Sequence, residues 1–167
     1  MNPEMRTFKL VLIGDGGVGK TSWITLIRTG EFCQRYISTK GVDVTVLTFH
    51  TTRGVVKFNV WDFAGLEKYC DLGDGYYIGA NCAIVMFDVN SRISHKNSKQ
   101  WETVFRRVND TVPLLTVGNK CDLPMKSTEM NQADYLISSN TEKDFGLPFL
   151  HLIRSLLNDY TIDFVEY

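Results

Sequence analysis

FKLVLIGDGGVGKT, residues Phe8–Thr21, is the stretch of sequence that decides the fold class. Its first half is a short apolar run that ends at Ile13, which predicts a buried β-strand. From Gly14 it fits the pattern G-x-x-x-x-G-K-[ST], a glycine-rich turn that leads into a helix. Such glycines let successive backbone N–H groups turn inward around phosphate oxygens. We therefore predict a phosphate-binding loop; the alternative is an ordinary strand-to-helix turn with an exposed lysine.

The loop also supplies two side chains with separate tasks. Lys20 would place a positive charge on the β- and γ-phosphates, which makes it a candidate catalytic residue. The Thr21 hydroxyl can ligate Mg²⁺. The residues that we expect to contact the phosphates are Asp15, Gly16, Gly17, Val18, Gly19, Lys20, Thr21 and Ser22.

Working outward from the loop, apolar runs alternate with helical patterns along the chain. The predicted strands are Thr7–Ile13, Val42–His50, Val55–Trp61, Cys82–Phe87 and Pro113–Val117, with a hairpin turn between the second and third. The predicted helices are Lys20–Arg28, one that carries Trp101, Val104, Phe105 and Val108 on one face, and one that carries Phe149 to Leu157. This alternation predicts an α/β fold with a doubly wound, mostly parallel sheet, in which ligands bind at the carboxyl ends of the strands.

Two further motifs fall at those strand ends. The first is D-x-x-G, from Asp62 to Gly65. The Asp62 carboxylate could hold Mg²⁺ through water, and the Gly65 N–H could reach a γ-phosphate. This motif carries weight only through its position after the third strand, because D-x-x-G occurs by chance in most chains of this length.

The second motif, N-K-x-D from Asn119 to Asp122, predicts the choice of base. The Asp122 carboxylate can accept both N1–H and the exocyclic amine of guanine, whereas adenine presents the opposite pattern. A site built in this way rejects the wrong base because buried groups would be left unpaired. Asn119 would bind the N7 edge or brace the loop, and Lys120 would lie along the ring face.

Composition excludes several other classes of protein. The chain has 167 residues, 44% of them hydrophobic and 22% charged, and a net charge of −1. These are the proportions of an ordinary globular domain, so a fibre, a disordered chain or a strongly basic nucleic-acid binder is not expected. We find no signal peptide, membrane span or lipidation cysteine, and we expect a protein with no membrane anchor and with reduced cysteines.

The order of the three motifs resembles that of Ras-type small GTPases, and within them the Ran family. The similar stretches include Phe8–Thr21, Phe49–Asp62, Gly73–Ile78 and Cys82–Arg92. The resemblance implies a P-loop NTPase with a Ras-like six-stranded sheet flanked by helices, one antiparallel edge strand, and a single domain over residues 1–167 that binds GTP or GDP with Mg²⁺.

The resemblance also assigns roles that the residues alone do not. Thr39 would ligate Mg²⁺ when GTP is bound, Phe32 would pack on guanine, and Tyr36 would close over the phosphates. Backbone groups of a third base-binding segment would contact the guanine oxygen, and this segment is Ser138, Ser139 and Asn140. Residues 31–41 and 63–78 would form the two switch segments that respond to the γ-phosphate.

The most informative departure from the family pattern is Leu66, which follows Gly65. The family has glutamine there, and that glutamine orients the attacking water. Leucine forms no hydrogen bond with its side chain, so we expect very slow GTP hydrolysis and a protein that stays in its GTP conformation. The substitution could be natural or engineered. The alternative is that Leu66 is neutral and water is positioned by another group.

Four smaller departures bear on the site and on partners. Phe63 replaces a small threonine, either filling a pocket or shifting Asp62, and Asn140 replaces a lysine near the base. The segment Leu123–Tyr135 is shorter than in Ran and lacks its basic stretch. The sequence also ends at Tyr167 without the acidic extension of the Ran type, which favours the GDP state in the family; truncation or a naturally short form would each explain this.

Three functions remain open from the sequence. The first is a Ran-type switch in nucleocytoplasmic transport that binds karyopherin-type receptors when loaded with GTP, with an exchange factor and a GAP as regulators. The second is a GTPase enzyme with GAP-assisted turnover, and the third is an adaptor in which GTP is a fixed ligand. For the first we expect a monomer in the nucleus and cytoplasm that binds no nucleic acid.

Overall fold

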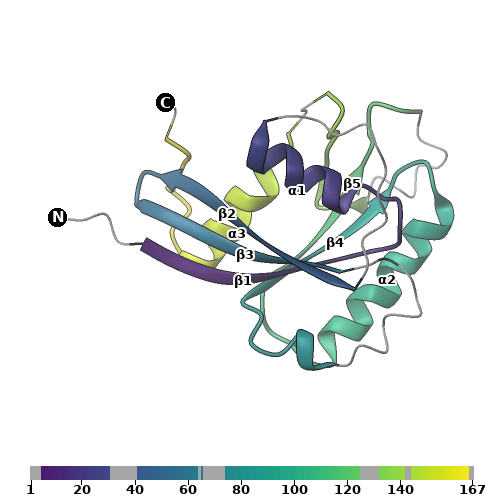
Figure 1. Cartoon of the computed structure of the whole chain (residues 1–167), viewed down its shortest axis with the longest axis horizontal. Helices are drawn as coiled ribbons and strands as arrows, with labels where there is room; N and C mark the ends of the chain where they lie inside the picture. The colour runs from purple at the N-terminus through teal and green to yellow at the C-terminus, as the bar shows by residue number, and fades with distance from the viewer. Residues whose placement is uncertain are drawn as a thin grey trace.

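A single six-stranded sheet with helices on both faces forms the framework of the chain (Figure 1). The structure, a computed structural model, describes residues 5–30, 41–63, 65, 74–124, 132–141 and 144–165. The strands are β1 Met5–Ile13, β2 Val42–Thr51, β3 Gly54–Phe63, β4 Cys82–Asp88, β5 Leu114–Asn119 and β6 Tyr135–Leu136. The helices of the described residues are α1 Lys20–Thr29, α2 Arg92–Arg106 and α3 Leu147–Leu157, with a 3-10 turn, η2, at Asp74–Tyr76.

The strand order is β2-β3-β1-β4-β5-β6. Strand β2 pairs antiparallel with β3 at one edge, and all the other neighbouring pairs are parallel. The hairpin closes at Thr51, whose hydroxyl donates to the Gly54 carbonyl at 2.8 Å. The predicted fold, a doubly wound and mostly parallel six-stranded sheet with one antiparallel edge strand, is therefore confirmed.

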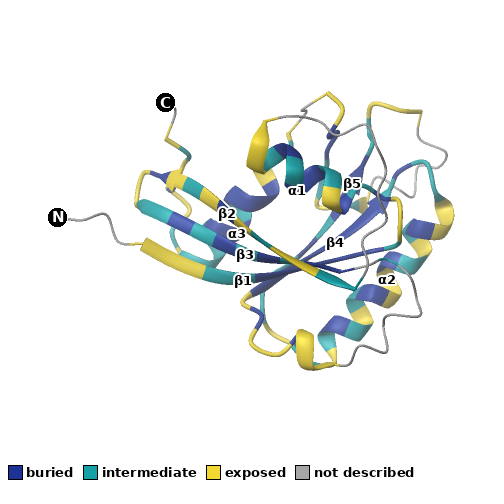
Figure 2. Ribbon diagram, viewed as in Figure 1, coloured by how far each residue is buried: buried dark blue, intermediate teal, exposed yellow. Residues whose placement is uncertain are grey.

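The core lies on both faces of the sheet, because successive side chains of a strand point to opposite sides. Leu10 and Leu12 of β1 face α1 and α3, where they join a cluster that contains Trp23 and Phe149. Val11 and Ile13 face α2 and join a second cluster with Trp101 and Phe105. The central strands β1 and β4 are buried where they cross the molecule, while edge strand β2 is largely exposed (Figure 2).

The helix boundaries follow local capping chemistry. Helix α1 ends at Gly30, which has a φ of 72° and donates its N–H to the Leu26 carbonyl at 2.7 Å. This left-handed C-cap suits glycine and matches the predicted stop. Helix α2 begins after Ser91, whose hydroxyl accepts the Ser94 N–H. It ends at Arg106, so Val108, which the sequence placed on the helix, lies beyond it.

The carboxyl ends of β1, β3, β4 and β5 meet at one edge of the sheet, as parallel pairing requires. The polar residues at these ends are Asp62, Asp88 and Asn119, and the glycine-rich loop follows β1. The sheet thus brings together segments that are more than a hundred residues apart. No described helix has the length and apolar character that crossing a membrane requires.

Candidate nucleotide-binding site

The glycine-rich loop is shaped by close backbone approaches that leave no room for side chains. A Cβ on Gly14 would lie 2.1 Å from the Met86 carbonyl oxygen, and the φ of Gly14 is +147°. A Cβ on Gly19 would lie 2.4 Å from Nδ2 of Asn119. Glycine is required at both positions, and the loop is thereby pressed against β4 and the N-K-x-D segment.

Lys20 is held by the loop that precedes it. Its Nζ donates to the carbonyl oxygens of Gly14 and Asp15, both at 2.9 Å, and the residue is only 6% exposed. Burial lowers the pKa of Lys20 to about 8, and the carboxylates of Asp62 and Asp15 oppose that shift. The ammonium therefore remains mostly charged at neutral pH and lies where the loop would receive phosphate.

Thr21 and Asp62 meet beside this lysine. The Thr21 hydroxyl donates to Oδ2 of Asp62 at 2.5 Å. The other carboxylate oxygen, Oδ1, is buried and has no hydrogen-bond partner among the described residues. Burial raises the pKa of Asp62, while the hydrogen bond from Thr21 and the charge of Lys20 lower it. An orphaned buried carboxylate oxygen next to a hydroxyl fits a hard divalent cation such as Mg²⁺.

This donor set defines what the residues can do with the metal. Thr21 and Asp62 would hold Mg²⁺ directly or through water. The ion would neutralise charge on the phosphates and fix their orientation. The expected third protein ligand, Thr39, lies outside the described residues.

Gly65 of the D-x-x-G motif rests on the phosphate loop. The Gly16 N–H donates to the Gly65 carbonyl at 2.9 Å. A Cβ on Gly65 would lie 2.0 Å from the Gly16 nitrogen and 2.1 Å from the Asp15 carbonyl carbon. The glycine of the motif is thus required by contact with the loop. Its predicted bond to a γ-phosphate stays a prediction.

A cavity of about 360 Å³ adjoins the loop at the other end of the site. Its walls come from three distant segments of the chain: Gly19, Ser22, Asn119, Lys120, Asp122, Leu123, Ser139 and Asn140. Most of these residues were predicted from the sequence to bind the base or the phosphates. The fold therefore brings together the segments that the sequence motifs identified.

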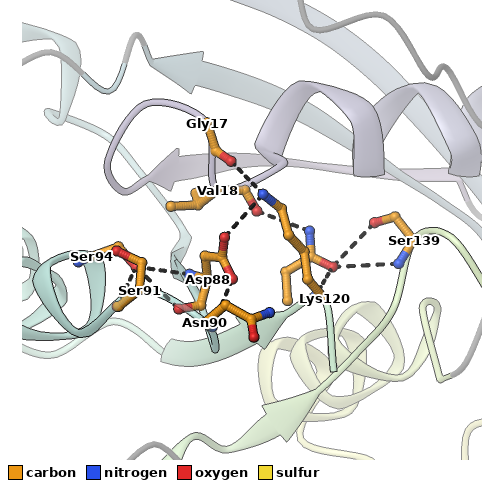
Figure 3. A network of polar contacts seen from close by, with 9 residues as sticks. Gly17, Val18, Asp88, Asn90, Ser91, Ser94, Lys120 and Ser139 are labelled. Carbon is orange, nitrogen blue, oxygen red and sulfur yellow. Dashed lines mark hydrogen bonds and ion pairs between the residues drawn. The ribbon is translucent and has the colours of Figure 1, made fainter. Parts of the chain in front are cut away.

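Asn119 braces the site. Its side chain is buried, with Nδ2 donating to the Val18 carbonyl at 3.0 Å. Its Oδ1 accepts the Lys120 N–H at 2.8 Å and lies 3.4 Å from the Ser139 nitrogen (Figure 3). Of the two roles that the sequence left open for Asn119, these contacts are those of the brace.

Lys120 extends from the same segment to the phosphate loop. Its Nζ donates to the Gly17 carbonyl at 2.8 Å and forms an ion pair with Asp88 at 3.0 Å (Figure 3). Asp88 is a residue that the sequence analysis missed. The available signal was its position, an acidic residue at the carboxyl end of β4 that pairs in register with Asn119. The contact of Lys120 with the ring face stays a prediction.

Asp122 is prepared to accept hydrogen bonds from a base. The Ser138 hydroxyl donates to its Oδ1 at 2.6 Å, and Nδ2 of Asn140 lies 3.3 Å from its Oδ2. The bond from Ser138 is the largest of the interactions that lower the pKa of Asp122. The carboxylate, ionised at neutral pH as an ordinary aspartate is, would offer the two acceptors that guanine requires.

The structure describes some of the remaining predicted residues and not others. Phe63 is buried and packs edge-on against Tyr77 at 5.3 Å, so it fills a core pocket while Asp62 keeps its bond to Thr21. The predicted site residues outside the described part of the chain are Phe32, Tyr36, Thr39 and Leu66.

A phosphate loop on a doubly wound sheet, a carboxylate–hydroxyl pair for a divalent cation, and an N-K-x-D cavity define the class of guanine-nucleotide-binding P-loop proteins. The sequence model of the Ras family matches residues 9–152. The chain therefore belongs to the Ras family and is a GTP-binding small GTPase switch. Proteins of this kind bind GTP or GDP with Mg²⁺ and are regulated by exchange factors and GTPase-activating proteins.

Proposed function

We propose that this Ras-family protein is a switch of the Ran type that binds GTP and hydrolyses it very slowly. The observation that carries the slow hydrolysis is Leu66, directly after Gly65. In small GTPases a glutamine at this position orients the water that attacks the γ-phosphate. A leucine side chain has no donor or acceptor, so it cannot perform that step.

The described residues support binding independently of turnover. Lys20 and the Thr21–Asp62 pair supply charge and metal ligation at the phosphates, and Asp122 supplies base selectivity. Phosphoryl transfer depends almost entirely on positioning and electrostatic stabilisation. Loss of the water-positioning group would therefore reduce hydrolysis while nucleotide affinity is retained.

The Ran-type role rests on sequence similarity. The stretches Phe49–Asp62 and Gly73–Ile78 resemble the Ran family, as does the stretch Cys82–Arg92. On this basis the GTP-loaded protein binds karyopherin-type transport receptors and acts in nucleocytoplasmic transport, in the nucleus and cytoplasm. A long-lived GTP state would prolong each receptor complex.

A single-turnover assay tests the hydrolysis proposal. The purified protein is loaded with GTP, and bound nucleotide is identified by chromatography over hours. We expect intact GTP in the wild type. Leu66→Gln restores the missing amide, and we expect it to hydrolyse GTP roughly 100-fold faster, the size of effect known for one positioned polar group in a transition state. Equal rates in the two proteins contradict the role of Leu66, and conversion of GTP to GDP by the wild type at a rate typical of small GTPases favours an active GTPase.

A binding assay tests the transport proposal separately. Immobilised karyopherin-type receptor is exposed to the protein loaded with GTP or with GDP, each verified by chromatography. We expect retention of the GTP form only. Retention of neither form contradicts a Ran-type role even if GTP binding is normal, and it would favour an adaptor whose partners differ.

A further inference from the structure

The side chain of Asp15, in the phosphate loop, forms hydrogen bonds with helix α2. Its Oδ2 accepts Nδ2 of Asn97 at 2.8 Å, and its Oδ1 accepts the indole N–H of Trp101 at 2.8 Å. Both donors lie on α2, four residues apart, so they share one face of that helix. Asn97 and Trp101 are outside every motif that identifies the nucleotide site.

The main chain of Asp15 serves the site directly. Its carbonyl oxygen accepts Nζ of Lys20 at 2.9 Å. The Asp15 carbonyl also lies against Gly65, because a Cβ on Gly65 would lie 2.6 Å from the Asp15 carbonyl oxygen. One residue therefore contacts the phosphate-binding lysine and the D-x-x-G glycine through its backbone, while its side chain is held by α2.

We propose that Asp15, Asn97 and Trp101 form a clamp through which α2 positions the phosphate loop for nucleotide binding. Asp15 is a positioning residue in this arrangement: α2 fixes its carboxylate, and its carbonyl in turn fixes Lys20. The proposal deepens the function proposed above and rests on guanine-nucleotide binding.

The choice of a carboxylate supports this role. A carboxylate presents two separate acceptor atoms, and each of them takes one of the two donors on α2. The charge itself opposes the ligand, because Asp15 belongs to the phosphate loop, where a carboxylate would repel phosphate oxygens. Asparagine would avoid that repulsion, but its amide nitrogen would face one of the donors.

These two effects predict opposite signs for Asp15→Asn. If only charge mattered, the variant would bind nucleotide more tightly. If the clamp positions the loop, the variant loses one of its two hydrogen bonds and binds less tightly. The sign of the change therefore decides between a positioning residue and a passive neighbour.

The test measures release of labelled GDP, with Mg²⁺ present, into excess unlabelled GDP. We expect Asp15→Asn and Trp101→Phe each to release GDP about tenfold faster, the effect of roughly one hydrogen bond to a charged group. The double variant should release GDP at about the rate of either single variant, not at the rate given by multiplying the two accelerations. The reason is that both changes break the same clamp. The preference for GDP over inosine diphosphate (IDP), whose base lacks the exocyclic amine that Asp122 would accept, should not change.

Trp23→Phe is the matched control. Trp23 is also buried and also donates its indole N–H, to the Phe145 carbonyl at 2.9 Å, on the face of the sheet away from α2. It should lose thermal stability without faster release. Equal acceleration by Trp23→Phe and Trp101→Phe would overturn the clamp, as would unchanged or slower release from Asp15→Asn.

The assay separates this inference from the function on which it rests. Wild-type binding with unaltered release from the variants overturns the clamp alone. A wild type that takes up no GDP overturns both. If Trp101→Phe does not fold, the sign of the change in Asp15→Asn still decides the question, because its half-buried side chain is replaced by one of equal size.

Discussion

At the scale of single residues, the predicted base selectivity would depend on how Asp122 is held. The Ser138 hydroxyl donates to this carboxylate at 2.6 Å from a segment that follows β6, and this bond is the main cause of its lowered pKa. The bond orients a carboxylate that is already ionised at neutral pH, and orientation is what accepting N1–H and the exocyclic amine of guanine together would require. We therefore expect selectivity to depend on the pair of Ser138 and Asp122 rather than on the aspartate of the motif alone.

Replacing Ser138 with alanine should therefore weaken the preference for guanine. We expect the ratio of GDP to IDP affinity to fall up to about tenfold, because one hydrogen bond to a charged group is lost. Equilibrium binding of both nucleotides measures this ratio. Ser139→Ala is the control, since the Ser139 hydroxyl lies 3.4 Å from Asn119 and does not contact Asp122. An equal fall in both variants would contradict the pairing.

The same substitution has a pH signature. Hydrogen bonding to the ionised form lowers the pKa of Asp122, so the wild-type carboxylate stays charged to a lower pH than an ordinary aspartate. In Ser138→Ala the pKa rises toward its ordinary value. On acidification, GDP affinity should then begin to fall at a higher pH in the variant than in the wild type. Coincident profiles would contradict this cause.

At the scale of elements, the D-x-x-G turn is fitted to the phosphate loop without spare space. Gly65→Ala places a methyl group 2.0 Å from the Gly16 nitrogen, and main-chain atoms cannot move aside as a flexible side chain does. We expect the turn to separate from the loop and the free energy of unfolding to fall by about 1–3 kcal/mol, as in other overpacked sites. Thermal unfolding measures the loss.

Gly75 in η2 provides the control for that experiment. Among the described residues, no atom lies within 4 Å of a Cβ built on Gly75. Gly75→Ala should therefore leave stability within about 0.5 kcal/mol, as surface substitutions usually do. A comparable loss in the two variants would mean that a general effect of alanine, not the contact with the loop, is responsible.

The elements also show what the sequence could and could not predict. Continuous apolar runs identified β1 to β5, and their ends differ from prediction by only one or two residues. The apolar pattern does not predict the first half of α2, because the buried positions before Trp101 hold small polar residues, Ser94 and Ser98. The two-residue strand β6 is too short for any periodic signal.

The same limit applies to the site. The motifs predicted most of the residues around the cavity because each motif has a fixed local spacing. Ser139 and Asn140 followed only from the family resemblance, and Leu123 was not predicted.

The sheet order creates two sets of long-range contacts that no motif contains. One is the ion pair between Asp88 and Lys120. The other is the pair of hydrogen bonds that Asn97 and Trp101 donate to Asp15. Taken one at a time, these residues form no pattern in the sequence, so only the assembled fold distinguishes them.

At the scale of the whole molecule, aromatic packing joins the sheet to the two helices on one face. Phe149 of α3 lies 4.9 Å from both Trp23 of α1 and Phe49 of β2, measured between ring centroids, and it is fully buried. Phe149→Ala should lower the free energy of unfolding by about 3–5 kcal/mol through a cavity between three elements. Denaturant titration measures this, with Phe164→Ala, at a half-buried position, expected to cost less.

The molecule also responds as a whole to its metal, because a ligand that binds only the folded state stabilises it by mass action. Removing Mg²⁺ with EDTA should speed GDP release and lower the melting temperature. The temperature should fall about 2–4 °C for each kcal/mol of binding free energy lost. Asp62→Asn removes the charge of the buried carboxylate, whose Oδ1 has no hydrogen-bond partner in the described part of the chain, so this variant should release GDP quickly with or without EDTA. Asp43→Asn is its matched control, because Asp43 is exposed and pairs directly opposite Asp62 in β2.

If both variants lose their response to EDTA, local charge rather than ligation by Asp62 explains the effect. If only Asp62→Asn loses it, the pair of Thr21 and Asp62 is the place at which the metal is coupled to the stability of the whole fold.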